Sequence, residues 1–162
     1  METTTVEIVA FKDEFAKYFT DLNLAWLKKY FVVEPIDYEM LSNPKAYIID
    51  KGGYIYFSKI EEEIAGTFSL LKLSDDVYEL SKMAVAEKFL GRKVGNEMMK
   101  FCIEEAIKLK AHKLILYSSR KLEPAIHLYK KYGFKEVPLI NSDYARSDIK
   151  MEIILNSVHE PN

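Results

Sequence analysis

The feature that most constrains this chain is the stretch from residue 77 to residue 134. Its pattern predicts a strand, a turn with two glycines, a long amphipathic helix, a second strand and a shorter helix closed by Gly133. Two parallel strands joined by a crossover helix place the helix N-terminus beside the carboxyl end of the first strand. The free N–H groups and the positive dipole end there can hold an anion, and we expect a phosphate.

The turn between this strand and helix, residues 89–98, reads FLGRKVGNEM. Gly91 and Gly95 would let backbone amides approach a pyrophosphate closely, and Arg92 and Lys93 add positive charge beside them. The alternative is that the glycines only make a tight connection, because two glycines after a strand are a weak signature. The helix is predicted from apolar residues at helical spacing: Val94, Met98, Phe101, Cys102, Ile103, Ala106 and Leu109.

This turn resembles one in the GCN5-related N-acetyltransferase (GNAT) superfamily. In that family it has the form Arg/Gln-x-x-Gly-x-Gly/Ala, and the corresponding positions here are Leu90, Lys93 and Gly95. Two of the three positions therefore depart from the family pattern. Gly91 fills a glycine often seen one place after the Arg/Gln.

A later segment resembles the same family more closely. Its form is an Asn, a short spacer, Ala-x-x-Leu-Tyr and then Gly-Phe, and the matching residues are Ala125, Leu128, Tyr129, Gly133 and Phe134. The usual Asn is absent, with Ser119 or Leu122 nearest its place. The resemblance covers residues 64–136 in order and spacing, and the whole chain more loosely.

The resemblance implies an α/β (α+β) fold, a single acyl-CoA N-acyltransferase domain over residues 1–162 with a mixed sheet of about seven strands and about four helices. It implies acetyl-CoA as the co-substrate, held by strand backbone freed by a bulge and by the amides of the glycine turn. Arg92 or Lys93 would add charge near the 3′-phosphate. The residues implied to bind acetyl-CoA are Met83, Ala84, Val85, Gly91, Arg92, Lys93, Val94, Gly95, Asn96 and Ser119.

Two residues are candidates for proton transfer. Glu79 lies in an otherwise apolar strand, which could raise its pKa toward a range useful for a base, or it could simply face solvent or pair with a lysine. Tyr129 occupies the family's Leu-Tyr position, where a phenol is expected near the cofactor sulfur. Its alternative role is to pack between helix and sheet.

We therefore expect an N-acetyltransferase that transfers an acetyl group from acetyl-CoA to a primary amine of a small molecule or peptide by direct attack. One alternative is an acyl-CoA-binding sensor or interaction module without catalysis. Another is a small interaction domain that uses its aromatic N-terminal helix. A homodimer is left open, and the acceptor cannot be read from the sequence.

Composition excludes several other classes of protein. With 162 residues the chain has the size of one domain, and a net charge of −2 does not favour nucleic-acid binding. No signal peptide or membrane span is expected, which places the protein in the cytoplasm. The single cysteine, Cys102, is expected to be a buried structural thiol rather than a reactive one, and the three histidines lack the spacing of metal ligands.

The remaining elements are predicted from pattern alone. We expect strands at 6–11, 46–50, 54–60, 65–71, 135–137 and 148–155, and helices at 15–30 and 34–41. Residues 51–53 would form a hairpin turn between two of these strands, and 159–162 a frayed tail. In the acetyltransferase fold the helix pair lies over the acceptor side of the cleft, so the loop at 31–38 is expected to carry substrate specificity.

Overall fold

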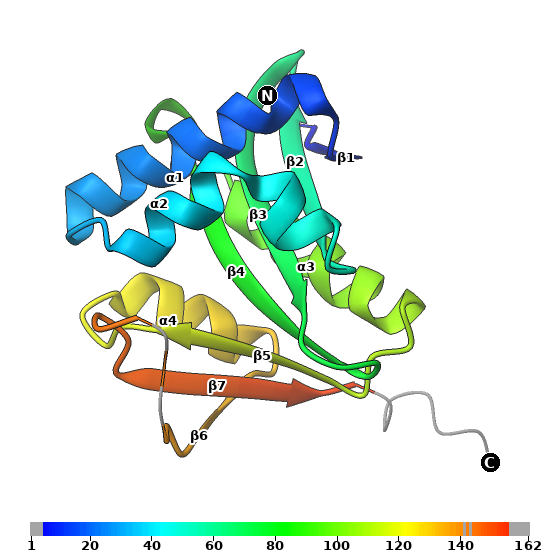
Figure 1. Ribbon diagram of the computed structural model, residues 1–162, viewed down its shortest axis with the longest axis vertical. Helices are drawn as coiled ribbons and strands as arrows, with labels where there is room; N and C mark the ends of the chain where they lie inside the picture. Colours follow the sequence, from blue (N-terminus) through cyan, green and yellow to red (C-terminus); the bar gives the residue numbers. More distant parts are fainter. Residues whose placement is uncertain (1–4, 141, 143, 156–162) are drawn as a thin grey trace.

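The computed structural model describes residues 5–140, 142 and 144–155, so the expected tail lies outside the described residues. They form a mixed sheet with the strand order β1-β2-β3-β4-β5-β7-β6 (Figure 1). The strands are β1 (Glu7–Ala10), β2 (Tyr54–Ile60), β3 (Glu63–Lys72), β4 (Val77–Val85), β5 (Lys113–Ser118), β6 (Lys135–Val137) and β7 (Ile149–Ile154). The helices are α1 (Ala16–Tyr30), α2 (Pro35–Ser42), α3 (Val94–Lys108) and α4 (Glu123–Lys131), with single turns η1 (Asp13–Phe15), η2 (Lys45–Ile49) and η3 (Glu87–Phe89). The predicted α/β fold is confirmed.

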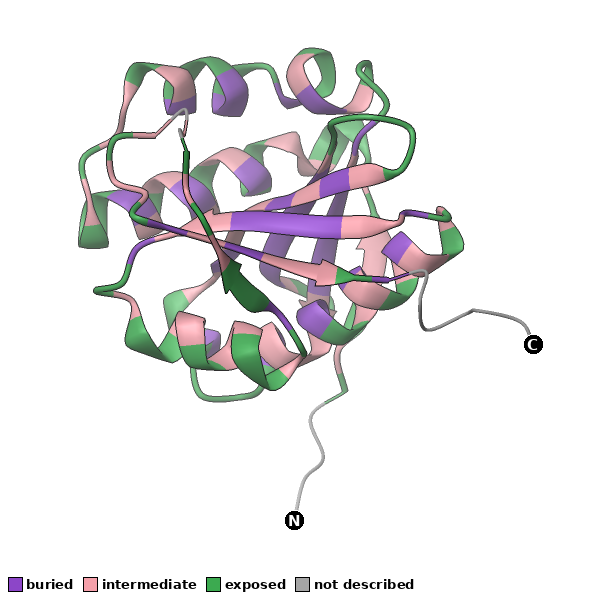
Figure 2. Ribbon diagram, turned by 90° about the horizontal axis from the view of Figure 1, so that it is seen from below, coloured by how far each residue is buried: buried purple, intermediate pink, exposed green. Residues whose placement is uncertain are grey.

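Helices cover both faces of the sheet, and the alternation of side chains along the strands creates a core on each face. In β2, Ile55 and Phe57 join a buried cluster with residues of α1 and α2, whereas Tyr56 joins the cluster formed with α3. Buried residues run along the middle strands, and the outer surfaces of the helices are exposed (Figure 2). The helices α1, α2 and α3 therefore each bury residues against the sheet, whereas the residues of α4 stay partly exposed.

The predicted strand at 46–50 is wrong, because these residues belong to the helical turn η2 and the adjoining Asp50. β2 already pairs with β1 on one side and β3 on the other, so no sheet edge is left for a hairpin partner. The turn instead closes through wide helical hydrogen bonds, such as the one from the Asp50 N–H to the Lys45 carbonyl at 2.8 Å. Ile48 is buried by this packing, and residues 51–53 connect a helical turn to a strand.

A β-bulge interrupts β4. Thr67 pairs with Ala84 and Ser69 with Ser81, so Lys82 and Met83 together lie opposite one residue of β3. Lys82 adopts a left-handed conformation with φ 54°. One extra residue in a strand bends it and re-aims its side chains, and the expected bulge is therefore present where β4 approaches α3.

The bulge coincides with a separation of two strands. β4 and β5 run parallel but pair only from Val77–Glu79 to Lys113–Ile115. Beyond this point β5 continues to pair with β7, while β4 continues along β3. The parting of β4 from β5 opens the sheet into a cleft.

A buried carboxylate ties together the segments around this cleft. Asp37 of α2 accepts hydrogen bonds from the Lys82 Nζ at 2.5 Å and from the Arg146 Nη1 and Nη2 at 2.9 and 3.0 Å. It also accepts one from the backbone N–H of Glu34, which completes a capping box at the start of α2. Asp37 therefore links α2 to the β4 bulge and to the segment before β7.

Burial acts on the pKa values of Asp37 and Lys82 in opposite directions. Burial would raise the pKa of Asp37, but hydrogen bonds from Arg146 and Lys82 outweigh it and lower the pKa to about 2. Burial lowers the pKa of Lys82, and the Asp37 carboxylate offsets this only in part.

Replacing Asp37 with Asn should destabilise the protein at pH 7 by about 3–5 kcal/mol, because two buried cations lose their counter-charge. The folded pKa of about 2 lies below the ordinary 3.8, so in the wild type this stabilisation is present above about pH 5 and lost as the pH falls toward 2. That loss should amount to about 2 kcal/mol and should be missing from the variant. Urea unfolding at a series of pH values measures both effects.

Asp50→Asn is the matched control, since Asp50 forms an exposed ion pair with Lys45 at 2.9 Å. Its stability at pH 7 should change by less than about 1 kcal/mol. Parallel stability curves for wild type and Asp37→Asn between pH 5 and pH 2 would contradict the lowered pKa.

Candidate active site

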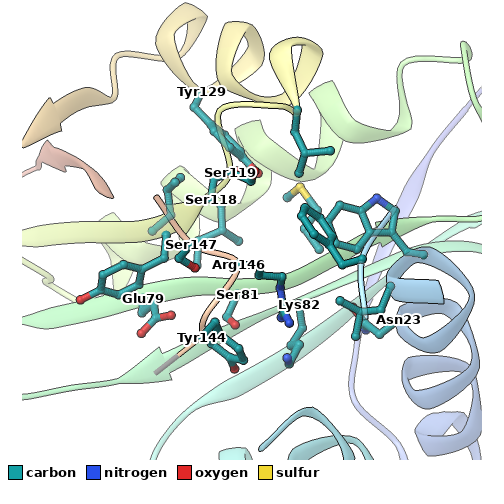
Figure 3. A pocket seen from close by; sticks show the side chains of 18 residues that line it. Asn23, Glu79, Ser81, Lys82, Ser118, Ser119, Tyr129, Tyr144, Arg146 and Ser147 are labelled. Carbon is teal, nitrogen blue, oxygen red and sulfur yellow. The ribbon is translucent and has the colours of Figure 1, made fainter. Parts of the chain in front are cut away.

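The cleft between β4 and β5 is lined by polar and charged side chains from several elements. Its walls come from α1, β4, β5, the start of α4 and the segment before β7 (Figure 3). Of the residues predicted from sequence, the structure brings together Glu79, Met83, Ser119 and Tyr129 as lining residues. These residues are up to 50 positions apart in sequence, and the parting of the strands places them around one cavity.

Tyr129 reaches into the cleft from α4 (Figure 3). Its ring packs edge-on against Phe134, with the centroids 6.1 Å apart, so the packing role considered from sequence is also present. Burial raises the pKa of Tyr129 to about 12, and a hydrogen bond with the Ser118 side chain lowers it in part. The phenol is therefore protonated throughout the neutral range, as a proton donor requires.

Glu79 lies where β4 and β5 part. It is partly buried, lines the cleft and belongs to the last parallel pair, opposite Ile115. Figure 3 shows its carboxylate beside the cavity rather than in the protein core. A carboxylate at this position can reach a molecule placed between the two strands.

Ser119 follows β5 and is 6 % exposed. Its Oγ accepts a hydrogen bond from the N–H of Lys121 at 3.4 Å, and its carbonyl accepts one from the N–H of Leu122. The residue thus shapes the loop that leads into α4, and Ser119 and Leu122 are the two residues nearest the place where the family usually has Asn. Its contact with acetyl-CoA stays a prediction.

The glycine turn contains two residues in the left-handed region. Gly91 has φ +79°, and a Cβ built there would meet nothing within 4 Å, so the surface over the loop is open. Lys93 is also left-handed, with φ 64° and ψ 22°, and α3 begins at the next residue. The loop and the start of this 15-residue helix therefore fit an anionic group held by backbone amides.

The side chains of this turn have separate tasks. Val94 is buried in the core, and the Asn96 Oδ1 accepts hydrogen bonds from the Lys131 Nζ at 3.0 Å and the Tyr132 hydroxyl at 3.3 Å. Asn96 thus ties α3 to α4 through its side-chain oxygen. The Arg92 guanidinium lies over the ring of Phe89, 5.4 Å from its centroid.

Not every predicted residue lies at the cleft itself. Ala84, Val85 and the loop at 91–96 are outside the described cavity lining and continue away from it along β4 and into α3. An extended molecule would have to run from the cleft along the bulged strand to reach them. Their roles in binding stay predictions.

Sequence reasoning missed several polar or aromatic residues of the cleft, among them Asn23, Lys82, Tyr144 and Arg146. Lys82 carried a signal, since it is a lysine in the apolar part of a strand. Arg146 carried none, because it lies in an irregular segment whose partners are more than 100 residues away. Its ion pairs follow from tertiary folding and not from any local pattern.

The structure also bears on the expectations for the single cysteine and for the loop at 31–38. Cys102 is fully buried and burial raises its pKa, which confirms a structural thiol. Phe31 of the expected specificity loop lines the cleft, and the Lys121 Nζ donates a hydrogen bond to the neighbouring Tyr30 carbonyl at 2.6 Å.

Among the described residues, no helix is long and apolar enough to span a membrane, and no His, Cys, Asp and Glu side chains group as metal ligands.

Comparisons with known proteins agree with this architecture. An N-acetyltransferase of Bacillus subtilis strain 168 known as YvbK, itself uncharacterised, is 27% identical over 128 residues, covering 77% of this chain and 82% of the relative. The crystal structure of a GNAT-family acetyltransferase from Staphylococcus aureus Mu50 superposes with a TM-score of 0.82 at 18% identity, covering 93% of this chain and 99% of that one.

A spermidine N-acetyltransferase from Vibrio cholerae, solved in complex with CoA and spermine, superposes with a TM-score of 0.72 at 17% identity. The alignment covers 96% of this chain and 98% of that one, and at this identity it speaks for the fold alone. The model of the acetyltransferase (GNAT) family matches residues 12–134, which include the bulged strand, the glycine turn and Tyr129. This chain belongs to the acetyltransferase (GNAT) family.

Proposed function

We propose that this protein transfers the acetyl group of acetyl-CoA directly to a primary amine bound in the cleft between β4 and β5. The observation that carries the proposal is the placement of Glu79 and Tyr129 around one cavity, formed where β4 parts from β5. Acetyl-CoA supplies an activated acyl group, so the protein must mainly position the reactants and manage protons.

The donor side is supported by the backbone of β4 and of the glycine turn. Amides at 83–85 would hold the pantetheine arm and the thioester oxygen, and amides at 91–96 would hold the pyrophosphate. The open surface at Gly91 supports this placement, because nothing within 4 Å of that position would obstruct a ligand. Ser119 would face the same ligand from the loop after β5.

Glu79 on β4 and Tyr129 on α4 would carry out two proton transfers. Glu79 takes a proton from the acceptor ammonium, directly or through water, and leaves a neutral amine to attack the thioester carbonyl. A carbon–nitrogen bond forms, the nitrogen loses its second proton to water, the carbon–sulfur bond breaks, and Tyr129 gives its phenolic proton to the departing sulfur. Solvent then reprotonates Tyr129, and Glu79 releases its proton.

Two measurements test the proposal as a whole. Acetyl-CoA should raise the melting temperature, since a ligand at 100 times its Kd stabilises the folded state by about 2.7 kcal/mol. Free thiol should then appear when an amine panel is added. Stabilisation without thiol release would favour the alternative of a non-catalytic acyl-CoA-binding module, and the absence of stabilisation would overturn both.

Replacing Gly95 with Val should abolish most of the stabilisation by acetyl-CoA while leaving the fold intact. The first added carbon would meet Leu128 at 3.6 Å, an ordinary contact, but the rest of the side chain would stand where the pyrophosphate is expected. Thermal-shift titration measures the effect. Glu104→Val, at an exposed position of the same helix, should keep the full shift. Equal shifts in Gly95→Val and wild type would show that the loop is misassigned.

Lys93 provides a second test of the loop. Its left-handed backbone suits glycine, so Lys93→Gly should fold at least as well as wild type, yet should lose CoA affinity if the lysine contacts a phosphate. Lys93→Ala should lose the same affinity and keep about the wild-type stability, because alanine bears the same left-handed strain as Lys93. Titrations at several salt concentrations measure both variants. Unchanged affinity and salt dependence in Lys93→Gly would remove the phosphate contact.

Replacing Tyr129 with Phe should lower kcat by about 10²-fold and leave acetyl-CoA affinity nearly unchanged. General acid help is typically worth about 10²- to 10⁴-fold, and the raised pKa of about 12 makes this phenol a weak acid, which favours the lower end. Because Tyr129 remains protonated up to about pH 11, the wild-type rate should rise with pH as the amine loses its proton, with no fall from Tyr129 below pH 10.

Single-turnover thiol release at a series of pH values separates chemistry from product release. Tyr47→Phe is the control, since the Tyr47 hydroxyl donates to Glu39 on the surface at 3.1 Å and does not line the cleft. Full turnover in Tyr129→Phe, with chemistry limiting the rate, would make the hydroxyl structural and water the acid.

A further inference from the structure

Arg146 is an unusual residue to find at a cleft wall, because it is cationic and largely buried. Its side chain is 16 % exposed and is held on one side by Asp37 and by the Glu34 Oε2, at 3.2 Å from Nη1. The ring of Tyr144 lies 4.4 Å from the guanidinium carbon and covers it. These contacts fix the guanidinium in one orientation.

The fixed guanidinium keeps donors for a further ligand. It has five N–H groups, and the described contacts to Asp37 and Glu34 account for two on Nη1 and one on Nη2. The Nε–H and the second Nη2–H lie outside these contacts, and Arg146 lines the cleft. A guanidinium with two donors left is suited to a carboxylate.

Lys82 adds a second cation at the same wall. Its side chain is 4 % exposed, yet it lines the cleft, with its Nζ 2.5 Å from Asp37 and 4.6 Å from the centroid of the Tyr144 ring. Figure 3 shows Lys82, Arg146 and Tyr144 together on the side of the cavity opposite the helix that carries Tyr129. Asp37 and Glu34 lie outside the described lining, so the cations stand between these carboxylates and the cavity.

Such a cluster is costly if its only purpose is stability. Buried ion pairs are often no better than apolar residues of the same volume, because each charge must leave water. Here Arg146 and Lys82 are paired with carboxylates on the side of α2 and still line a cavity. Glu79 lines the same cavity at the point where β4 and β5 part. Positive and negative charges therefore line different parts of one cleft.

We propose that the acceptor is a small primary amine that carries a carboxylate, whose carboxylate is bound by Arg146, with Lys82 beside it, while the amine faces Glu79 and the thioester. This inference rests on the proposed function and names its substrate class. The carboxylate takes no part in the bond changes and only orients the amine, which makes Arg146 and Lys82 specificity-determining residues.

The same arrangement disfavours a polycationic acceptor. The Vibrio cholerae relative was solved with spermine, but here a second ammonium of a polyamine would meet Arg146 instead of a carboxylate. Like charges at close range oppose binding, so the cleft should select against polyamines.

The test compares amines that differ only in the carboxylate. Thiol release from acetyl-CoA is measured with L-phenylalanine against 2-phenylethylamine, L-leucine against 3-methylbutylamine, and spermidine as the polycation, each at the same concentration of neutral amine. In at least one pair, the carboxylated amine should have a kcat/KM about tenfold or more above that of its partner without the carboxylate. Spermidine should have a lower kcat/KM than that carboxylated amine.

Arg146→Gln should lower the ratio of kcat/KM between the two members of the preferred pair by roughly 10- to 100-fold, because a charged hydrogen-bonded contact is lost. Arg146→Lys should retain part of the preference, since it keeps the charge without the planar fork. Lys45→Gln, which breaks an exposed ion pair outside the cleft, should leave the ratio unchanged. The ratio is informative even if Arg146→Gln is partly unfolded, because unfolding lowers both rates equally.

The outcomes distinguish a failure of the proposed function from a failure of the proposed acceptor class. A lack of stabilisation by acetyl-CoA, or stabilisation without turnover of any amine, overturns the proposed function itself. Turnover in which the decarboxylated amines or spermidine are equal or better, or in which Arg146→Gln keeps the wild-type ratio, overturns the carboxylate-bearing acceptor and leaves the acetyltransferase activity standing.

Discussion

The buried carboxylate of Asp37 is the interaction on which the shape of the cleft depends. It joins a helix, a bulged strand and the segment before β7, and the two cations it binds come from residues 45 and 109 positions away. Lys82 sits at the bulge itself, in a left-handed conformation that a strand would not otherwise adopt. The carboxylate therefore fixes a strained piece of backbone next to the place where the reacting groups are expected.

The sequence predicted the parts of the fold whose signals are local. The βαβα stretch, the glycine turn and the helix that carries Tyr129 all follow from hydrophobic spacing and helix-ending residues. Residues 46–50 were mispredicted because Tyr47, Ile48 and Ile49 resemble a strand, and only the occupied edges of β2 exclude one. Arg146 was missed for a related reason, since its significance depends on partners that the fold brings to it.

Lys93 and Ser119, two residues that depart from the family pattern, can be interpreted from their contacts and backbone conformation. Lys93 stands where the family pattern has glycine, and it adopts a left-handed backbone that costs a residue with a side chain some strain. Ser119 stands near the place of the family's Asn, and its hydroxyl and carbonyl accept hydrogen bonds from the loop that leads into α4. Both residues therefore contribute to the backbone conformation of their own segment.

The short ladder between β4 and β5 has a mechanical consequence. Only the pairs from Val77 to Glu79 join the strands β1 to β4 to the strands β5 to β7 within the sheet. Such a seam is a natural hinge, because a small rotation about it widens or narrows the cleft while the long antiparallel ladders on both sides stay intact. In amide hydrogen exchange, opening should then be fastest at the seam, while the core that both parts of the sheet share with α3 stays protected.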